Sequence, residues 1–210
     1  MSSLVGKKAP LFEADAVIDG NEFIEKFTLE QFIGKKYVLF FFYPMDFTFV
    51  CPTEIIAFQD KLSEFEKRNC AVVGCSVDSK YSHKAWLSLE RKKGGIKGVT
   101  FPLVSDFSKS IAVNFDVLAG EYENSDEDAN EISFEGVPVA YRALFLIDKQ
   151  GIVRHQLVND LPLGRSVDES LRTLDALRHF EKYGEVCPAN WHKGDKALDS
   201  TPEAIEEYLG

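Results

Sequence analysis

Cysteine, methionine and tryptophan are scarce in this chain, whose 210 residues include four cysteines, two methionines and two tryptophans. Four cysteines are too few for a small secreted fold held together by disulfides. They stand at positions 51, 70, 75 and 187 without a C-x-x-C pair, so a structural zinc site is poorly supported. We therefore expect a reducing cytosol, in which each cysteine is either a packing residue or a chemical group.

Long apolar runs and an excess of basic residues are also absent. The longest apolar run, residues 37–43, is far too short to cross a bilayer, and the first eight residues have no apolar core of signal-peptide length. Acidic residues outnumber basic ones by 34 to 24, which gives a formal charge of −10 and argues against a nucleic-acid binder. We expect neither a membrane nor a nucleic acid as a partner.

The acidic residues are unevenly distributed. Seven of them lie between Gly120 and Gly136 without a lysine or arginine, so the rest of the chain carries a charge of only −3 out of −10. We expect this acidic insertion, at about residues 120–136, to be an exposed loop between a helix and a strand. Length and composition suit one globular domain, residues 1–184, followed by an arm, residues 185–210, that is too short and polar to fold alone.

The hydrophobic pattern predicts an α/β fold with a mixed central sheet flanked by helices. A capping box at Ser166–Glu169 predicts a helix that ends at Gly184, and Thr201 precedes one more short helix. The other expected elements are strand 37–43, helix 53–68, strand 71–77, helix 82–92, strand 101–104, helix 108–115 and a hairpin of strands 143–147 and 152–157.

The segment between the first buried strand and the following helix carries the candidate chemistry. Cys51 stands at the start of that helix, and Pro52 suits the first helical position. A thiol there is close to unpaired backbone N–H groups and the positive end of the helix dipole, which both favour a thiolate. Thr48 can supply a hydroxyl to the thiolate or to a bound oxygen, and Pro44 can shield the pocket from water. The alternative is that Cys51 is a small buried hydrophobe, as cysteine usually is.

Two motifs identify a family. Pro44, Thr48 and Cys51 form the pattern Pro-x-x-x-Thr-x-x-Cys, and residues 184–191 read Gly-Glu-Val-Cys-Pro-Ala-Asn-Trp. With these motifs the chain resembles the typical two-cysteine peroxiredoxins, which include thioredoxin-dependent peroxidases and proteins like alkyl hydroperoxide reductase C. The resemblance covers nearly the whole chain and implies a thioredoxin-like fold. Its other matching blocks are residues 6–10, 141–142 and 159–166.

The resemblance implies a role for each matched residue. Cys51 would attack the peroxide as a thiolate and become a sulfenic acid, and Arg142 would stabilise the thiolate and hydrogen-bond the peroxide. Glu54 and Arg165 would form an ionic network that orients Arg142; the alternative for each arginine is a solvated surface charge. Cys187 of the partner subunit would then condense with the sulfenic acid in an intersubunit disulfide. Cys70 and Cys75 are expected to be packing residues.

The resemblance also implies the partners. It predicts a homodimer, commonly assembled into a decameric ring, that reduces hydrogen peroxide and small organic hydroperoxides and is recycled by a thioredoxin-like or flavoprotein reductant, with no cofactor or metal. A redox-regulated holdase chaperone or a peroxide-signalling protein stays open as an alternative. A general disulfide oxidoreductase is disfavoured because Cys51 lacks a C-x-x-C partner.

The sequence departs from the family in two places. Family members prone to overoxidation pair a Gly-Gly-Leu-Gly loop with a C-terminal Tyr-Phe, whereas this chain has Gly94–Gly98, with the sequence Gly-Gly-Ile-Lys-Gly, and Tyr208-Leu209. We therefore expect intermediate sensitivity to excess peroxide. The acidic insertion is longer than this connection usually is in the family, and a second interpretation is that it modulates reductase docking or assembly.

Overall fold

The computed structural model describes residues 2–124 and 132–210. Contacts divide the chain into two compact units, Met1–Arg165 and Ser166–Gly210. This division groups the long helix α5 (Val167–Tyr183) with the C-terminal segment, whereas the sequence suggested a boundary after residue 184, which stays a prediction. Within the described residues, no helix is long and apolar enough to span a bilayer.

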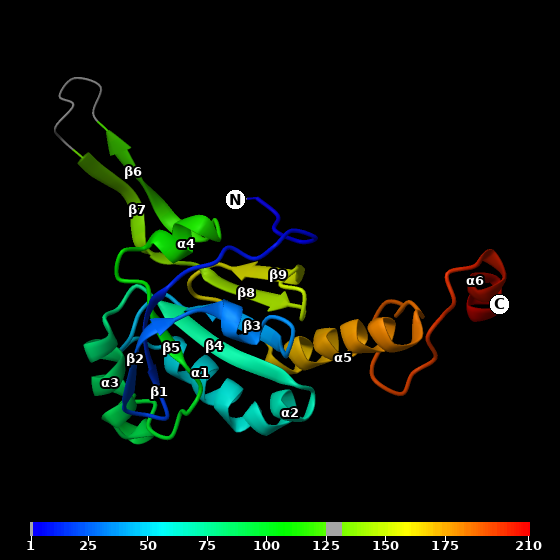
Figure 1. Cartoon of the computed structure of the whole chain (residues 1–210), viewed down its shortest axis with the longest axis horizontal. Helices are drawn as coiled ribbons and strands as arrows, with labels where there is room; N and C mark the ends of the chain where they lie inside the picture. The colour runs from blue at the N-terminus through cyan, green and yellow to red at the C-terminus, as the bar shows by residue number, and fades with distance from the viewer. Residues whose placement is uncertain (1, 125–131) are drawn as a thin grey trace. The chain divides into compact units, whose positions relative to one another are not determined.

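A seven-stranded mixed sheet forms the centre of the first unit, with the strand order β2-β1-β5-β4-β3-β8-β9 (Figure 1). Strand β3 pairs in parallel with β4 and antiparallel with β8, which confirms the predicted mixed α/β architecture. The hairpin of β1 and β2, at the edge of the sheet, was not predicted. The strands are β1 (Ala14–Ile18), β2 (Glu22–Phe27), β3 (Tyr37–Phe42), β4 (Cys70–Ser76), β5 (Leu103–Ser105), β8 (Arg142–Ile147) and β9 (Val153–Asn159).

The helices of this unit are shorter than the hydrophobic pattern predicted. The expected helix 53–68 is two helices, because Lys61 leaves the helical conformation at φ −103° and ψ 6°. The expected helix 82–92 ends early because Leu89 is extended. The α-helices are α1 (Cys51–Asp60), α2 (Leu62–Lys67), α3 (Lys80–Ser88) and α4 (Ser110–Asn114), and the 3₁₀ helices are η1 (Leu29–Phe32) and η2 (Arg91–Lys93).

Both faces of β3 are covered, which explains why this strand is a continuous apolar run. Because successive side chains of a strand point to opposite faces, Phe40 and Phe42 face one way and Phe41 the other. Phe40 and Phe42 pack against Phe115 at the end of α4, with ring centroids 5.1 and 5.3 Å apart. Phe41 stacks on Phe58 of α1 at 4.6 Å. This double packing fixes the end of β3, from which the Cys51 segment continues.

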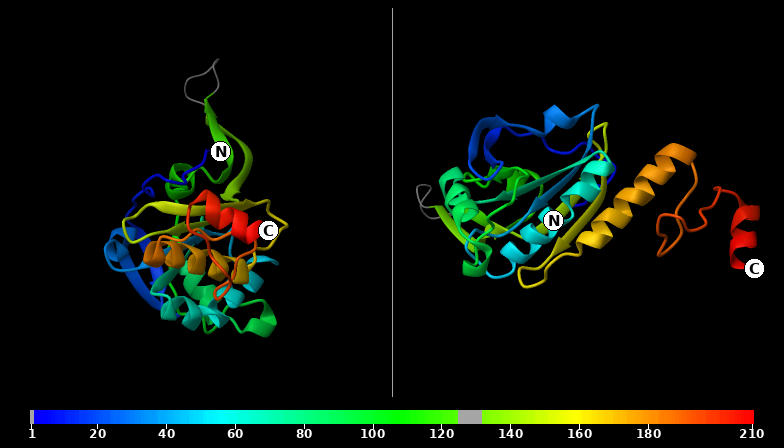
Figure 2. Two further views of the ribbon diagram at one scale, coloured as in Figure 1. Left: turned by 90° about the vertical axis from the view of Figure 1, so that its right-hand side faces the viewer. Right: turned by 90° about the horizontal axis from the view of Figure 1, so that it is seen from below.

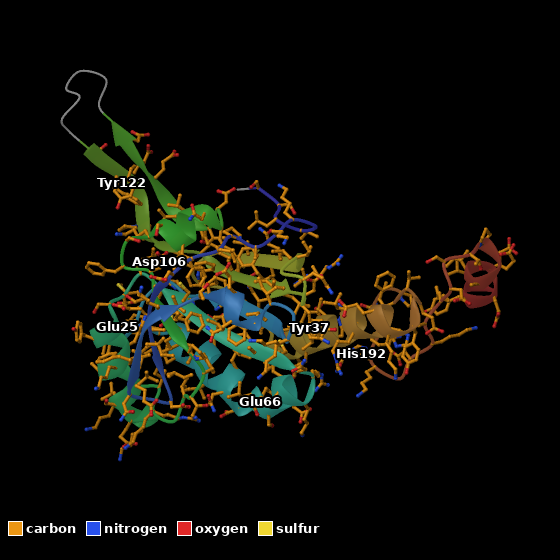
Figure 3. All side chains as sticks on the ribbon, in the orientation of Figure 1. Glu25, Tyr37, Glu66, Asp106, Tyr122 and His192 are labelled. Atoms are coloured by element: carbon orange, nitrogen blue, oxygen red, sulfur yellow. The ribbon has the colours of Figure 1, made fainter. Side chains whose placement is uncertain are left out.

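The acidic insertion is largely exposed, as we expected, but it is not a loop, as far as it is described. Strands β6 (Leu118–Asn124) and β7 (Ile132–Ala140) form an antiparallel ribbon that extends away from the central sheet (Figures 1 and 2). The rings of Tyr122, labelled on the ribbon in Figure 3, and Phe134 meet edge to face at 4.9 Å. In the middle of β7, Gly136 has a φ of +92°, which favours glycine. The insertion's other acidic positions, within 125–131, lie outside the described residues.

The C-terminal unit contains α5 and the short helix α6 (Pro202–Leu209). Ser166 Oγ accepts a hydrogen bond from the first turn of α5 at 3.2 Å, and Gly184 ends the helix with a φ of 77°. Thr201 Oγ1 accepts a hydrogen bond from the first turn of α6. The predicted start and end of α5 and the predicted start of α6 are therefore confirmed.

Candidate active site

Cys51 is the first residue of α1 and lies beyond the carboxyl end of β3, and its side chain is completely buried. The residue before it, Val50, makes no side-chain cap, so the backbone N–H groups of the first turn receive no bond from a capping side chain. Pro52 occupies the first turn as predicted. The sulfur therefore lies at the positive end of a helix, in a site from which water is excluded.

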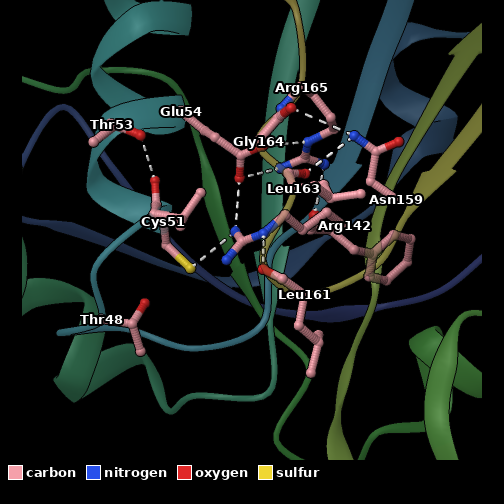
Figure 4. A network of polar contacts seen from close by, with 12 residues as sticks. Thr48, Cys51, Thr53, Glu54, Arg142, Asn159, Leu161, Leu163, Gly164 and Arg165 are labelled. Atoms are coloured by element: carbon pink, nitrogen blue, oxygen red, sulfur yellow. Dashed lines mark hydrogen bonds and ion pairs between the residues drawn. The ribbon is translucent and has the colours of Figure 1, made fainter.

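Arg142, the first residue of β8, brings a positive charge to this sulfur (Figure 4). Its Nη1 donates to Cys51 Sγ at 3.3 Å and to a carboxylate oxygen of Glu54 at 2.8 Å. Its Nε donates to the main-chain oxygen of Leu161 at 2.6 Å. Arg142 is only 4% exposed, which excludes the alternative of a solvated surface charge. The guanidinium thus places a permanent positive charge and an N–H donor beside the sulfur of Cys51.

Glu54 links the two buried arginines from the first turn of α1. Its carboxylate accepts hydrogen bonds from Arg142, from Arg165 Nε and Nη2, and from the backbone N–H of Arg165, at 2.8 to 2.9 Å. Burial raises the pKa of Glu54. The hydrogen bonds and charge of Arg165, together with the charge of Arg142, lower this pKa by more than burial raises it. The pKa of Glu54 therefore lies below its ordinary value of 4.5, and the carboxylate is ionised at neutral pH.

Arg165 ties this network to the sheet. Its Nη1 donates to the main-chain oxygens of Phe42, at the end of β3, and Ala143, in β8, at 2.7 and 2.6 Å. The guanidinium group is almost completely buried, so Arg165 is no surface charge either. The structure thus brings together Cys51, Glu54, Arg142 and Arg165, as the resemblance implied, although their roles in a reaction stay predictions.

Thr48 and Pro44 lie in the segment that leads from β3 to Cys51. Thr48 lies on the other side of the sulfur from Arg142 in Figure 4. Its hydroxyl donates to the main-chain oxygen of Met45 at 2.9 Å, which leaves the oxygen lone pairs as acceptors. Pro44 is buried. The roles that the sequence suggested for Thr48 and Pro44 beside Cys51 stay predictions.

A buried polar cluster that the sequence did not reveal holds the same segment. Asp46 accepts a hydrogen bond from the Tyr43 hydroxyl at 2.9 Å and contacts His83 Nδ1 at 2.8 Å. His83 Nε2 lies 3.2 Å from the main-chain oxygen of Val104. Burial lowers the pKa of His83, but the hydrogen bond and charge of Asp46 raise it above 6.5 overall. With an acceptor at each ring nitrogen, His83 fits a protonated imidazole that anchors the loop before Cys51.

The other cysteines are less suited to react with peroxide in this state. Burial, with the charge of Asp106, raises the pKa of Cys75 well above its ordinary value, and Cys70 is buried as well. Cys187 lies in the C-terminal unit, partly buried, and its thiol donates to the main-chain oxygen of Ala176. Burial and Glu185 raise its pKa more than Arg172 lowers it, so it rests as a thiol. Among the residues that the structure describes, no three His, Cys, Asp or Glu side chains could hold a metal ion together.

Comparison with known proteins identifies the family. Residues 5–156 match the AhpC/TSA family, and residues 176–210 match the C-terminal domain of 1-Cys peroxiredoxin. A chloroplastic 2-Cys peroxiredoxin of Spinacia oleracea is 51% identical over 206 residues, which cover 98% of this chain and 71% of that protein. A thioredoxin peroxidase of Echinococcus granulosus is 44% identical over 209 residues, or 100% of this chain and 99% of that protein.

Solved structures agree with these sequence matches. The crystal structure of reduced Plasmodium vivax 2-Cys peroxiredoxin superimposes with a TM-score of 0.87 at 50% identity and covers 99% of both chains. The match extends through the Cys51 site and the segment that carries Cys187. This chain belongs to the peroxiredoxin family and is similar throughout its length to the 2-Cys peroxiredoxins.

Proposed function

We propose that this chain reduces hydrogen peroxide and small organic hydroperoxides with Cys51 as the attacking thiolate. The observation that carries the proposal is the contact of Arg142 Nη1 with Cys51 Sγ at 3.3 Å inside a buried site. A hydroperoxide is uncharged, so catalysis has to come from a deprotonated sulfur and from donors directed at the departing oxygen. Among the described cysteines, Cys51 is the one with an arginine donor on its sulfur.

The first step exchanges an O–O bond for an S–O bond. The Cys51 thiolate attacks one peroxide oxygen, the O–O bond breaks, and the sulfur keeps that oxygen as a sulfenic acid while the other leaves as water or an alcohol after it takes up a proton. Arg142, through Nη1 and Nη2, is the donor that we assign to the developing negative charge. Thr48 Oγ1, which gives its own proton to the main-chain oxygen of Met45, is the acceptor that we assign to the peroxide hydroxyl.

The second step uses the thiol of the C-terminal unit. Cys187 of the partner subunit attacks the Cys51 sulfenic acid, an S–S bond forms, and water leaves with the thiol proton. The raised pKa of Cys187 is consistent with a thiol that waits for the more electrophilic sulfenic sulfur and does not compete for peroxide. Because an intersubunit disulfide requires two chains, the proposal includes a homodimer.

A dithiol reductant completes the cycle by thiol–disulfide exchange with the Cys51–Cys187 disulfide. We propose a thioredoxin-like protein for this role, since a relative that matches the full chain is named a thioredoxin peroxidase; a flavoprotein reductant is the second candidate. A decameric ring of dimers and a cytosolic compartment are the corresponding proposals for assembly and location.

Coupled peroxide consumption tests the proposal. The reduced protein, thioredoxin, thioredoxin reductase and NADPH are mixed with hydrogen peroxide, and NADPH oxidation is followed. We expect turnover by the wild-type chain and none by Cys51→Ser, whereas Cys70→Ser, which changes another buried cysteine, is the control that keeps turnover. Failure of the wild-type chain to consume peroxide, or full activity of Cys51→Ser, contradicts the proposal. A holdase chaperone would instead retain its activity in Cys51→Ser.

A further inference from the structure

The loop between β9 and Arg165 supplies two contacts of the candidate active site. Near its start, the main-chain oxygen of Leu161 accepts the Nε hydrogen bond of Arg142 at 2.6 Å. At its end, the backbone N–H of Arg165 donates to Glu54 at 2.8 Å. Since both contacts depend on where the backbone lies, the shape of this loop determines how Arg142 is oriented.

Asn159 connects the loop to the strand that precedes it. It is the last residue of β9, and its Cα is paired in register with that of Arg142 on β8. Its side-chain amide Nδ2 donates to the main-chain oxygens of Leu163 at 3.1 Å and Gly164 at 3.4 Å (Figure 4). The backbone of Asn159 therefore lies beside that of Arg142, and its side chain holds the second half of the loop.

The first half of the loop has its own hydrogen bonds. Asp160 accepts the backbone N–H of Leu161 with its carboxylate at 2.7 Å and that of Leu163 with its main-chain oxygen at 3.1 Å. These bonds close a turn, but they do not attach that turn to the strand. Between Leu163 and the anchored residue Arg165, the Asn159 amide is the side-chain contact that joins the loop to β9.

We propose that Asn159 is a positioning residue for the reaction of Cys51. The hydrogen bonds of its amide hold the loop against β9. The main-chain oxygen of Leu161 therefore stays within hydrogen-bond distance of Arg142 Nε, and the guanidinium stays directed at the sulfur. Charge-assisted bonds such as the one from Arg142 Nε depend strongly on distance and direction. A small displacement of this oxygen therefore rotates the guanidinium away from Cys51. The inference rests on the proposed peroxidase function.

Three substitutions weaken the hydrogen bonds between the Asn159 side chain and the loop to different degrees. Asn159→Ser keeps one donor, Asn159→Ala removes the donor, and Asn159→Asp places a carboxylate against two carbonyl oxygens. The rate constant of reduced Cys51 with hydrogen peroxide is expected to fall by about threefold to tenfold in Asn159→Ala. The fall is smaller in Asn159→Ser and larger in Asn159→Asp. The kcat/KM for the reductant stays unchanged, because that step does not use Arg142.

Gln156→Ala is the matched control. Gln156 lies on the same strand, and its side-chain amide also bonds a main-chain group, accepting the N–H of Leu4 at 2.9 Å. This variant is expected to react with peroxide at the wild-type rate. If Asn159→Ala reacts as fast as the wild-type chain, or if Gln156→Ala slows the reaction equally, Asn159 has no positioning role.

A second readout separates this inference from the proposed function. The folded protein is treated with iodoacetamide at a series of pH values. The extent of alkylation of Cys51 is then measured by mass spectrometry on the peptide that contains it. A positioning role moves the rise in alkylation to higher pH in Asn159→Ala but not in Gln156→Ala, because a misdirected guanidinium stabilises the thiolate less. An unchanged profile overturns the inference whether or not the wild-type chain reduces peroxide. A wild-type chain that does not react with peroxide overturns the proposed function alone.

Discussion

Glu54→Gln removes the negative charge that two buried guanidinium groups share. Glu54 is 3% exposed, Arg142 4% and Arg165 9%, so solvent does little to compensate the two positive charges. Glutamine has nearly the same shape, but its amide group turns N–H donors toward arginine donors. Breaking a buried ion pair by removing one partner costs about 3–5 kcal/mol. We therefore expect Glu54→Gln to lower the free energy of unfolding by about that amount at neutral pH.

Urea unfolding, followed by tryptophan fluorescence and circular dichroism, measures this loss. Glu64→Gln is the control, because Glu64 also pairs with two cations, Lys67 and Arg68, but at an exposed site where ion pairs contribute little. Peroxide reduction by Glu54→Gln should also slow, since one of the two oxygens that accept from Arg142 and Arg165 becomes an amide nitrogen and the pair is no longer held in place. A free energy of unfolding within about 1 kcal/mol of the wild-type value would refute the view that this carboxylate compensates buried charge.

The pH dependence gives the same prediction a sign. The pKa of Glu54 is lower in the folded protein than its ordinary value of 4.5. A carboxyl group with a lowered folded-state pKa stabilises the fold fully above its unfolded value, and this contribution is lost as pH falls through the folded value. The stability difference between the wild-type chain and Glu54→Gln should therefore be constant near neutral pH and shrink below about pH 4.5. A difference that grows on acidification would contradict the assignment.

Three further predictions concern other parts of the chain. Thr48→Val should slow the reaction with peroxide by about tenfold or more, because the acceptor for the peroxide hydroxyl is lost, whereas Thr48→Ser should keep most of the rate; stopped-flow tryptophan fluorescence measures both. The pKa of Glu123 is raised, because its side chain is hydrogen-bonded to Glu135 and lies close to the charge of that residue. At neutral pH the two carboxylates repel each other, so Glu135→Gln should slow amide hydrogen exchange in the ribbon more at neutral pH than at pH 4. An equal effect of the substitution at both pH values would count against this repulsion. Lys97→Gly combined with Leu209→Phe gives the loop Gly-Gly-Ile-Gly and the C-terminal pair Tyr-Phe, both closer to the family pattern, and it should increase inactivation per turnover at excess peroxide; unchanged inactivation would show that these residues are irrelevant.

Local features of the fold were predictable because their causes are local. The cap of Ser166 and the end of α5 at Gly184 depend on residues within one helical turn. The strand 37–43 was evident because both faces of β3 are buried. The break of the helix at Lys61 was not evident, since the apolar spacing continues across it. The ribbon was missed because charged residues obscure its alternation, although Tyr122 and Phe134 mark its two strands.

The active site was predictable only in part. The position of Cys51 at a helix start followed from the residues around it, but Arg142, Glu54 and Arg165 were named through the family resemblance. Glu54 and Arg165 are 111 residues apart, and nothing in their immediate surroundings indicates that they meet. The oxygen of Leu161 was not predictable, because every residue has a main-chain oxygen and only the path of the loop selects this one.

The most direct test of the account is to find which sulfur a peroxide molecule oxidises. The reduced protein is treated with one equivalent of hydrogen peroxide, alkylated and digested, and the peptides are identified by mass spectrometry without reduction. We expect a Cys51–Cys187 disulfide between two chains of the wild-type protein. In Cys187→Ser we expect a sulfenic acid at Cys51 that dimedone labels. Oxidation first at Cys70 or Cys75, or no oxidation of Cys51, would contradict the account.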